Sequence, residues 1–215
     1  MTKLSRRVFL GAAPAAAAEA AIKWDDTYNV IVIGAGLSAA VSAKEAGCKK
    51  VVVLEKMMFA GGNTIRAGGG FNAAIKADYE KAGIKDSPDL HAQQTLAAGD
   101  GRGHPVLVHQ LTEKAPESVQ WLKDHGVKFE DHIYQIYAGL YKRARNPIGP
   151  RGGAYIKALL EVCKKEDIPI LYNTRVVEII REHQLSGRVL GVKVEQKGGK
   201  TLYLRALNGA VAAAG

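Results

Sequence analysis

Residues 29–55 read NVIVIGAGLSAAVSAKEAGCKKVVVLE, and this stretch decides the fold. An apolar run, VIVI, passes directly into Gly34-Ala35-Gly36, and small residues with helical character follow it. A second apolar run, VVVL, ends in Glu55. This order predicts a strand, a glycine turn, a helix and a second strand, which together are typical of a dinucleotide-binding unit.

Each part of this unit has a chemical task. Glycines let the backbone approach a pyrophosphate, and the free N–H groups at a helix N-terminus stabilise its negative charge. An acidic residue about twenty positions later can accept hydrogen bonds from the ribose hydroxyls. A glycine-rich turn without a ligand is the alternative. The predicted contacts in this segment are Gly34, Ala35, Gly36, Glu55 and the adjacent Lys56.

A second glycine-rich segment, GGNTIRAGGGFNAA, occupies residues 61–74. An NAD site needs no such segment, whereas a flavin requires backbone contact along its ribityl chain and isoalloxazine ring. Glycines permit that approach, and Asn and Thr side chains supply hydrogen bonds. The segment therefore favours FAD over NAD, with a flexible surface loop as the alternative. The predicted contacts are Gly62, Asn63, Thr64, Gly69 and Gly70.

These motifs resemble the N-terminal part of a flavoprotein family. The family contains soluble fumarate reductases of the flavocytochrome c type, urocanate reductases and the succinate dehydrogenase flavoprotein subunit. The resemblance runs from about residue 25 to residue 215, and Gly-Gly-Asn-Thr at 61–64 is its most specific part. Further matches are Trp121-Leu122 ahead of Gly126, Lys142-Arg143 before Pro147, and Asn173-Thr174-Arg175-Val176.

The resemblance implies an α/β fold over residues 25–215: a Rossmann-like FAD-binding domain of the glutathione-reductase type, with a parallel sheet plus a β-meander. It implies that Val176 contacts the adenine through its backbone and that Gly215 belongs to the cofactor contacts. In the succinate dehydrogenase branch, a His just after the Gly pair bonds the flavin covalently. Asn63 holds that place here, so we expect non-covalent FAD.

The sequence departs from the family pattern at the first glycine turn. Ala39 stands where Gly-x-Gly-x-x-Gly places its third Gly, and Gly47 follows about three residues early. Either the turn or the first helix is shortened. Three residues are close to one helical turn, so a shorter helix would keep its apolar face in phase.

The sequence given ends at residue 215, which corresponds to about the middle of the family's flavoprotein. The resemblance implies that the capping domain, the last flavin-contacting segment and the Arg and His residues that bind the dicarboxylate and deliver the proton lie beyond it. We therefore expect an incomplete FAD-binding domain without its capping domain, and we assign no catalytic residue. A complete small protein with a short C-terminal strand is the alternative.

The implied activity is hydride transfer from reduced flavin to an enoate such as fumarate. The implied partners are a small anionic substrate and a separate electron donor. A multihaem cytochrome c is one candidate donor, and we expect it to be a separate protein because the haem-attachment motif Cys-x-x-Cys-His is absent from these residues. Two alternatives are a non-catalytic flavin-binding remnant and a dehydrogenase of the same superfamily that acts on another substrate, such as a steroid or an amino acid.

Residues 1–21 carry an export pattern. Ser5-Arg6-Arg7-Val8-Phe9-Leu10 matches a twin-arginine signal, and Ala-rich sequence follows. This signal predicts a periplasmic protein, exported after it has folded around its cofactor, and a cytoplasmic one if the signal does not function. No stretch is long and apolar enough to predict a transmembrane helix.

The net charge of +9 includes one local cluster, Lys142, Arg143, Arg145 and Arg151. A solvated basic face is the simpler interpretation, and a positive approach path for an anionic substrate is the functional one. Nucleic-acid binding is not expected, because no groove-reading motif is present. Cys48 and Cys163 form no metal pattern and are expected to be buried thiols.

The spacing of apolar residues in the rest of the chain predicts helices and strands that support the site. Pro116 suits the first turn of a helix, and the expected core side chains nearby are Leu107, Leu111, Val119 and Leu122. Helices are expected at 90–96, 106–113, 117–125 and 154–165, and short strands at 168–172, 176–181, 189–196 and 201–207.

Overall fold

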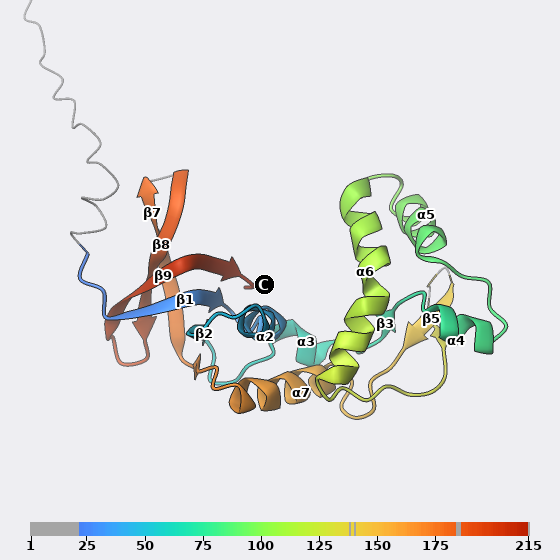
Figure 1. Cartoon of the computed structure of the whole chain (residues 1–215), viewed down its shortest axis with the longest axis horizontal. Coiled ribbons are helices and arrows are strands. Elements are labelled where there is room, and N and C mark those ends of the chain that lie inside the picture. Colours follow the sequence, from blue (N-terminus) through green and yellow to red (C-terminus); the bar gives the residue numbers. More distant parts are fainter. Residues whose placement is uncertain (1–21, 138, 140, 184–185, 215) are drawn as a thin grey trace, which may run out of the picture. The chain divides into compact units, whose positions relative to one another are not determined.

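The computed structural model describes residues 22–137, 139, 141–183 and 186–214 (Figure 1). The chain divides into two compact units. The sheet unit contains the described residues through Ala60 and from Glu166 onward, and the helical unit is Gly61–Lys165. The predicted segment 1–21 lies outside the described residues.

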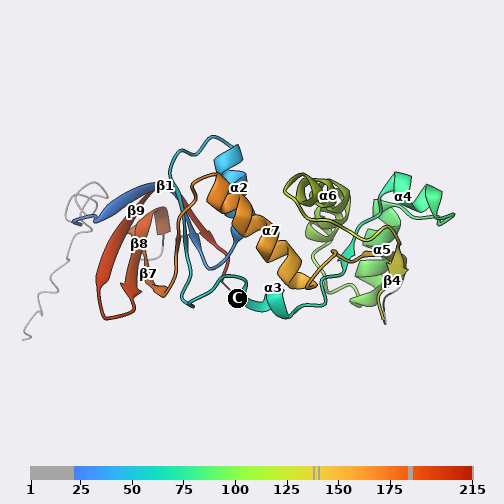
Figure 2. The same cartoon turned by 90° about the horizontal axis from the view of Figure 1, so that it is seen from below.

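The sheet unit is built on a six-stranded sheet in the order β6-β2-β1-β9-β8-β7. The first four strands in this order run parallel, and β8 and β7 continue the sheet in antiparallel pairing. Figure 2 shows β7, β8 and β9 lying side by side. The strands are β1 Asp26–Ile33, β2 Val51–Leu54, β6 Ile170–Leu171, β7 Thr174–His183, β8 Ser186–Gln196 and β9 Thr201–Ala212.

This topology confirms the predicted parallel sheet with a β-meander. One detail differs, because the third meander strand and the apolar run near the C-terminus form a single strand, β9. β9 pairs with β8 on one side and with β1 on the other. It therefore joins the meander to the parallel sheet.

The apolar runs become strands whose side chains fill the core. All four residues of β2 are buried, as expected for a parallel strand covered on both faces. The core of the sheet unit contains Ile31, Val52, Val192 and Leu204. Helix α2, Leu37–Glu45, buries Leu37, Ala40 and Val41.

The helical unit combines short helices with a three-stranded antiparallel sheet in the order β3-β5-β4. Ser87 caps α5, because its hydroxyl accepts a hydrogen bond from the Leu90 N–H at 3.0 Å. The elements are α3 Gly62–Arg66, β3 Phe71–Asn72, α4 Lys76–Lys81, α5 Pro88–Ala98, α6 Pro105–Asp124, β4 Tyr134–Gln135, β5 Lys142–Arg145 and α7 Gly152–Lys165.

Two predicted helices are one in the structure. Helix α6 runs continuously through Pro116, and Pro105 occupies its first turn instead. Its buried residues begin at Thr112 and include Val119 and Leu122, as expected for the latter two. Leu107 and Leu111 are 61% and 62% exposed, so their prediction as core residues was wrong. The first two turns of α6 contribute no buried side chain to the core.

Helix α7, Gly152–Lys165, agrees closely with the helix predicted at 154–165. Ile156, Leu159 and Cys163 are buried along one face, and Leu160 is half-buried. Burial raises the pKa of the Cys163 thiol to about 11, so this thiol stays protonated and packs as an apolar group. Cys48 is half-buried. Among the described residues, no helix has the length and apolar character needed to cross a membrane.

The continuity of α6 through Pro116 leads to a stability prediction. Pro116→Ala would supply an N–H where an interior helical position lacks one, so the free energy of unfolding should rise by about 1–3 kcal/mol. Urea denaturation followed by circular dichroism measures this change. Pro105→Ala is the matched control and should have little effect, because Pro is favoured in a first turn. An unchanged or lower stability of Pro116→Ala would contradict a continuous helix.

Candidate functional site

The first glycine turn connects β1 to α2 in three residues, Gly34 to Gly36. The Gly34 N–H donates to the Leu54 carbonyl at 2.8 Å, which ties the turn to the end of β2. The Gly36 N–H donates to the Gly34 carbonyl at 2.8 Å, and the Leu37 N–H to the Ala35 carbonyl at 2.9 Å. Two such i to i−2 bonds make this a tightly closed turn.

The glycines of this turn are required by the protein's own packing. Gly34 has φ +86°, and a Cβ there would lie 2.8 Å from the Ala213 carbonyl oxygen. A Cβ on Gly36 would lie 2.5 Å from the Ala213 Cβ. The residues after β9 therefore press directly on the turn, a contact for which the sequence alone gave no signal.

The structure gives the lengths of the turn and of the helix that follows it. The three-residue Gly-x-Gly link is retained, and α2 begins at the next residue and is nine residues long. Its first backbone bond within the helix joins the Ala40 N–H to the Gly36 carbonyl at 3.2 Å. The N–H groups of Ser38 and Ala39 lie in the preceding turn, where helical N–H groups have no partner within the helix. This end of α2 can stabilise an anion.

Glu55 lies at the end of β2, beside this turn. Its side chain is 6% exposed, and one carboxylate oxygen, Oε1, accepts a hydrogen bond from the Met57 N–H at 2.8 Å. Its backbone N–H donates to the Leu171 carbonyl at 3.0 Å, and its carbonyl accepts from the Thr174 N–H at 2.9 Å. The following Lys56 is exposed. The Glu55 backbone is therefore held by β6 and by the start of β7, and its carboxylate is held by the Met57 N–H.

Val176 lies on β7, two residues after the Thr174 that bonds to Glu55. It is half-buried and pairs with Val194, and a β-bulge follows it. The predicted adenine contact thus lies two residues from Thr174, which bonds to the predicted ribose ligand. Gly215 lies outside the described residues.

The second glycine-rich segment was predicted as a loop and is partly regular. Gly61 and Gly62 have φ +124° and +44°, and the short helix α3 begins at Gly62. Asn63 and Thr64 lie in this helix with exposed side chains. The segment ends in strand β3, which pairs with β5.

Packing requires Gly69, and it brings the end of a side chain close to Gly70. A Cβ on Gly69 would lie 2.8 Å from the Arg151 carbonyl carbon, and one on Gly70 would lie 2.6 Å from the Tyr134 hydroxyl. The Tyr155 hydroxyl donates to the Gly69 carbonyl at 2.6 Å. Burial raises the pKa of Tyr155 to about 12, so this hydroxyl keeps its proton and remains a donor. The backbone contact and the positive φ explain Gly69 without any ligand, whereas the neighbour of Gly70 is the end of a side chain.

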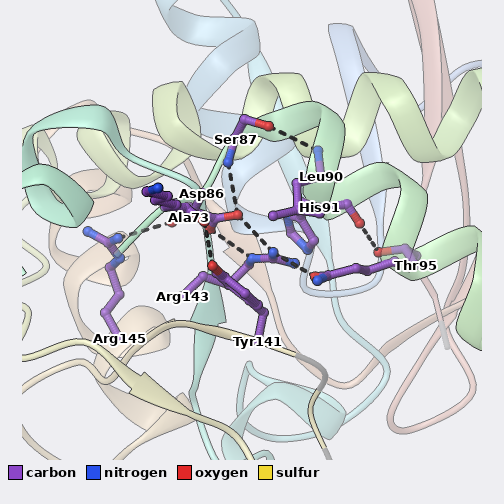
Figure 3. A network of polar contacts seen from close by, with 11 residues as sticks. Ala73, Asp86, Ser87, Leu90, His91, Thr95, Tyr141, Arg143 and Arg145 are labelled. Carbon is purple, nitrogen blue, oxygen red and sulfur yellow. Dashed lines mark hydrogen bonds and ion pairs between the residues drawn. The ribbon is translucent and has the colours of Figure 1, made fainter. Parts of the chain in front are cut away.

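The predicted basic cluster separates into buried and exposed residues, and Figure 3 shows the buried Arg143 and Arg145. Arg143 is buried and donates to Asp86 through Nε at 2.9 Å and Nη2 at 2.8 Å. Arg145 is buried as well and forms an ion pair with Asp78. A solvated face is therefore wrong for these two arginines, because each is neutralised by a carboxylate distant in sequence. Lys142 and Arg151 are exposed, as that interpretation expects.

Sequence reasoning missed His91. It lies on α5 and is 6% exposed, and its Nδ1 has no hydrogen-bond partner among the described residues. Burial and the charge of Arg143 lower its pKa below the ordinary value. In the sequence, the only indication of its burial is the neighbouring small apolar residue Ala92, which is also buried in α5.

A parallel sheet, a glycine turn at a helix N-terminus and a buried acid after the second strand define a Rossmann-like dinucleotide-binding fold. Residues 29–215 match the family described as FAD binding domain. The chain belongs to this family, and fumarate reductase flavoproteins are among its relatives.

Several relatives are oxidoreductases or reductases named for fumarate or acrylate. The chain is 36% identical over 158 residues to NADH:fumarate oxidoreductase of Klebsiella pneumoniae (strain 342), covering 72% of this chain and 17% of that protein. It is 34% identical over 175 residues to fumarate reductase (cytochrome) of Shewanella frigidimarina, covering 79% and 30%. It is 30% identical over 204 residues to the acrylate reductase flavoprotein subunit of Shewanella woodyi (strain ATCC 51908 / MS32), covering 90% and 40%.

Solved structures agree with the fold. The open conformation of a flavocytochrome c3 fumarate reductase superposes with a TM-score of 0.78 at 27% identity, covering 85% of this chain and 33% of that chain. A 3-ketosteroid dehydrogenase from Rhodococcus jostii RHA1 has the same TM-score at 24% identity, which supports the fold alone. The chain spans less than half the length of each of these relatives.

The contact between Ala213 and the glycine turn can be tested by comparing two alanine variants. Gly34 and Gly47 have nearly equal φ of +86° and +90°, but only a Cβ on Gly34 would meet another atom within 4 Å. Gly34→Ala should therefore lower the free energy of unfolding by about 1–3 kcal/mol more than Gly47→Ala. Urea denaturation of both variants measures the difference. Equal destabilisation would show that the turn does not press on the residues after β9.

Proposed function

We propose that this chain is the FAD-binding part of a flavoprotein reductase that acts on an enoate of the fumarate or acrylate class. The observation that carries the proposal is the placement of the glycine turn, the α2 N-terminus and the buried Glu55 at one end of β1 and β2. The assignment to enoates is supported by relatives at 30–36% identity that are named fumarate and acrylate reductases.

The residues of the sheet unit fit the adenosine diphosphate half of FAD. The N-terminal turn of α2 presents the N–H groups of Ser38 and Ala39 to an anion, which suits the pyrophosphate. Glu55 Oε1 is engaged by Met57, and a carboxylate has further acceptor capacity at Oε2 for a ribose hydroxyl. Gly34, Ala35, Gly36, Lys56 and Val176 complete the proposed contacts, with Gly215 added from the family resemblance.

The residues proposed for the flavin half are Gly62, Asn63, Thr64, Gly69 and Gly70. Asn63 and Thr64 expose side chains that can donate and accept hydrogen bonds. Asn63 carries no nucleophile for a covalent bond to the flavin, so we propose non-covalent FAD. When bound, FAD supplies the hydride chemistry, while these residues bind and orient it. No residue of this chain is assigned as catalytic.

The proposed role as the FAD-binding part of such a reductase can be tested with a chimera. Residues 29–215 would replace the aligned segment of the Shewanella frigidimarina fumarate reductase, whose remaining length completes the protein. We expect the purified chimera to bind FAD and to reduce fumarate in a viologen-linked assay at about 1–1000 turnovers per second. A flavin-loaded, folded chimera without fumarate turnover would contradict the proposed role, because this segment would then not place FAD for hydride transfer.

Individual contacts can be tested through FAD affinity. Glu55→Ala should weaken FAD binding by about 1.5–3 kcal/mol, the range for a hydrogen bond to a charged group. Asn63→Ala should weaken it as well, whereas Glu195→Ala, an exposed carboxylate on β8, is the control and should not. Fluorescence titration measures the affinities, and acid precipitation should leave the flavin in solution. Wild-type affinity in both site variants would show that FAD binds elsewhere.

We further propose that residues 1–21 direct twin-arginine export to the periplasm, where a separate electron donor would reduce the flavin and a small anionic substrate would oxidise it. The double variant Arg6→Lys, Arg7→Lys should abolish export, because the transport route recognises the guanidinium pair. Cell fractionation followed by immunoblotting measures this. Equal periplasmic amounts of the variant and the wild type would contradict the proposed signal.

A further inference from the structure

We propose that the helical unit holds a second ligand site, in which a short monocarboxylate binds between Arg143 and His91. The site is a cavity of about 230 Å³ lined by residues of α5, β3, β5 and the segment before β5. This volume is below the ~300–1,000 Å³ of drug-sized pockets, so it suits a ligand of a few non-hydrogen atoms. None of its lining residues is a proposed FAD contact, so the site goes beyond the proposed function.

The first observation is that the Arg143 guanidinium is held rigidly and keeps one nitrogen available for a ligand. Arg143 uses Nε and Nη2 on Asp86, and Nη2 also donates to Gln94 Oε1 at 2.7 Å. The guanidinium carbon lies 4.9 Å from the centre of the Tyr141 ring. Among the described residues, Nη1 has no hydrogen-bond partner, and Arg143 lines the cavity. A fixed guanidinium with an available nitrogen is well suited to a carboxylate.

The second observation is the buried imidazole of His91, which lines the same cavity (Figure 3). Its side chain is 6% exposed, and its Nδ1 has no partner within the part of the chain that the structure describes. Buried polar atoms are almost always hydrogen-bonded, so an exception indicates a missing partner. A carboxylate has two oxygens, so one can bond to Arg143 Nη1 and the other to the imidazole of His91. Nδ1 is enclosed by protein in this structure, so its bond to the ligand requires the His91 ring to turn.

The rest of the lining favours a hydrogen-bond acceptor. Gln94 uses its carbonyl oxygen on Arg143, which leaves its amide N–H groups as donors, and Asn72 adds a second amide. The lining residues include no Asp or Glu. Both oxygens of Asp86 already accept hydrogen bonds from Arg143. The cavity therefore offers several N–H donors and no carboxylate that would repel a bound anion.

Carboxylate binding should be coupled to the protonation of His91. The charged groups that face His91 are Arg143 on β5, which lowers its pKa together with burial, and Asp86 ahead of α5, which raises it. His91 is thus favoured in its neutral form when no anion is present. A bound anion favours the imidazolium, so it should raise the pKa of His91, and by linkage the anion should bind more tightly as the pH falls.

The test is an NMR titration of the full chain with ¹⁵N-labelled histidine at constant ionic strength. Sodium acetate is the probe, and acetamide, which has a similar shape and no charge, is the control. We expect acetate to shift the His91 ring nitrogens saturably and to raise the pKa of His91. The rings of His104 and His183 should not respond, and acetamide should have no effect. The absence of a saturable shift at His91 would overturn the proposal.

Two variants sharpen the result. His91→Leu keeps a comparable volume and should weaken acetate binding about tenfold, followed through the Asn72 and Gln94 side-chain amides. His109→Leu on α6 is the matched control and should bind acetate like the wild type. If His91→Leu does not fold, the wild-type titration alone decides. An equal response of the exposed His132 would show only adventitious anion binding, and tighter binding of inorganic phosphate would overturn the assignment to carboxylates.

Discussion

The parallel pairing of β9 with β1 is the constraint on which the rest of the sheet unit depends. It continues past both strands, where the Ala213 N–H donates to the Ile33 carbonyl at 2.8 Å. This contact brings Ala213 against the glycine turn and leaves no room for a Cβ at Gly34 or Gly36. Because Gly34 also bonds to the residue before Glu55, the turn, the α2 N-terminus and the acid are held together.

The helical unit is organised by buried charge. Two arginines of β5 reach carboxylates outside that strand, Arg143 at Asp86 and Arg145 at Asp78. Buried ion pairs add little net stability, but removing one partner is costly because the other charge remains buried. We infer that these pairs specify how β5 packs against the segments around α4 and α5. The same pairing holds Arg143 rigid at the edge of the proposed carboxylate site.

Much of the sheet unit could be predicted because its signals are local. Apolar runs, a glycine turn and an acid after the second run lie within residues 29–55, and each became the expected element. The helical unit was harder to predict because its determinants are distant in sequence. Asp86 lies 57 positions from Arg143 in the sequence. The basic residues at 142–151 therefore gave no sign that Arg143 is buried against a carboxylate. Pro116 was wrongly predicted to begin a helix, because a proline that suits a first turn can also lie inside a longer helix.

The glycines show a second limit of prediction from sequence. Gly69 was assigned to the flavin, and the structure gives it a packing reason against the backbone of Arg151. A glycine required by the fold carries no information about a ligand, so the exposed Asn63 and Thr64 are the stronger flavin candidates in that segment. Glu55 is different, because its position after β2 and its buried carboxylate agree with the chemical role inferred for it.

We propose that the sheet unit binds the adenosine diphosphate half of FAD. Comparing the affinities of the chain for FAD and for FMN, which lacks the adenosine half, tests this most directly. The Glu55 hydrogen bond alone, at about 1.5–3 kcal/mol, corresponds to about ten- to a hundredfold in affinity. With the pyrophosphate at α2 added, we predict that FAD binds about a hundredfold more tightly than FMN or better. Equal affinity for the two flavins would contradict the account.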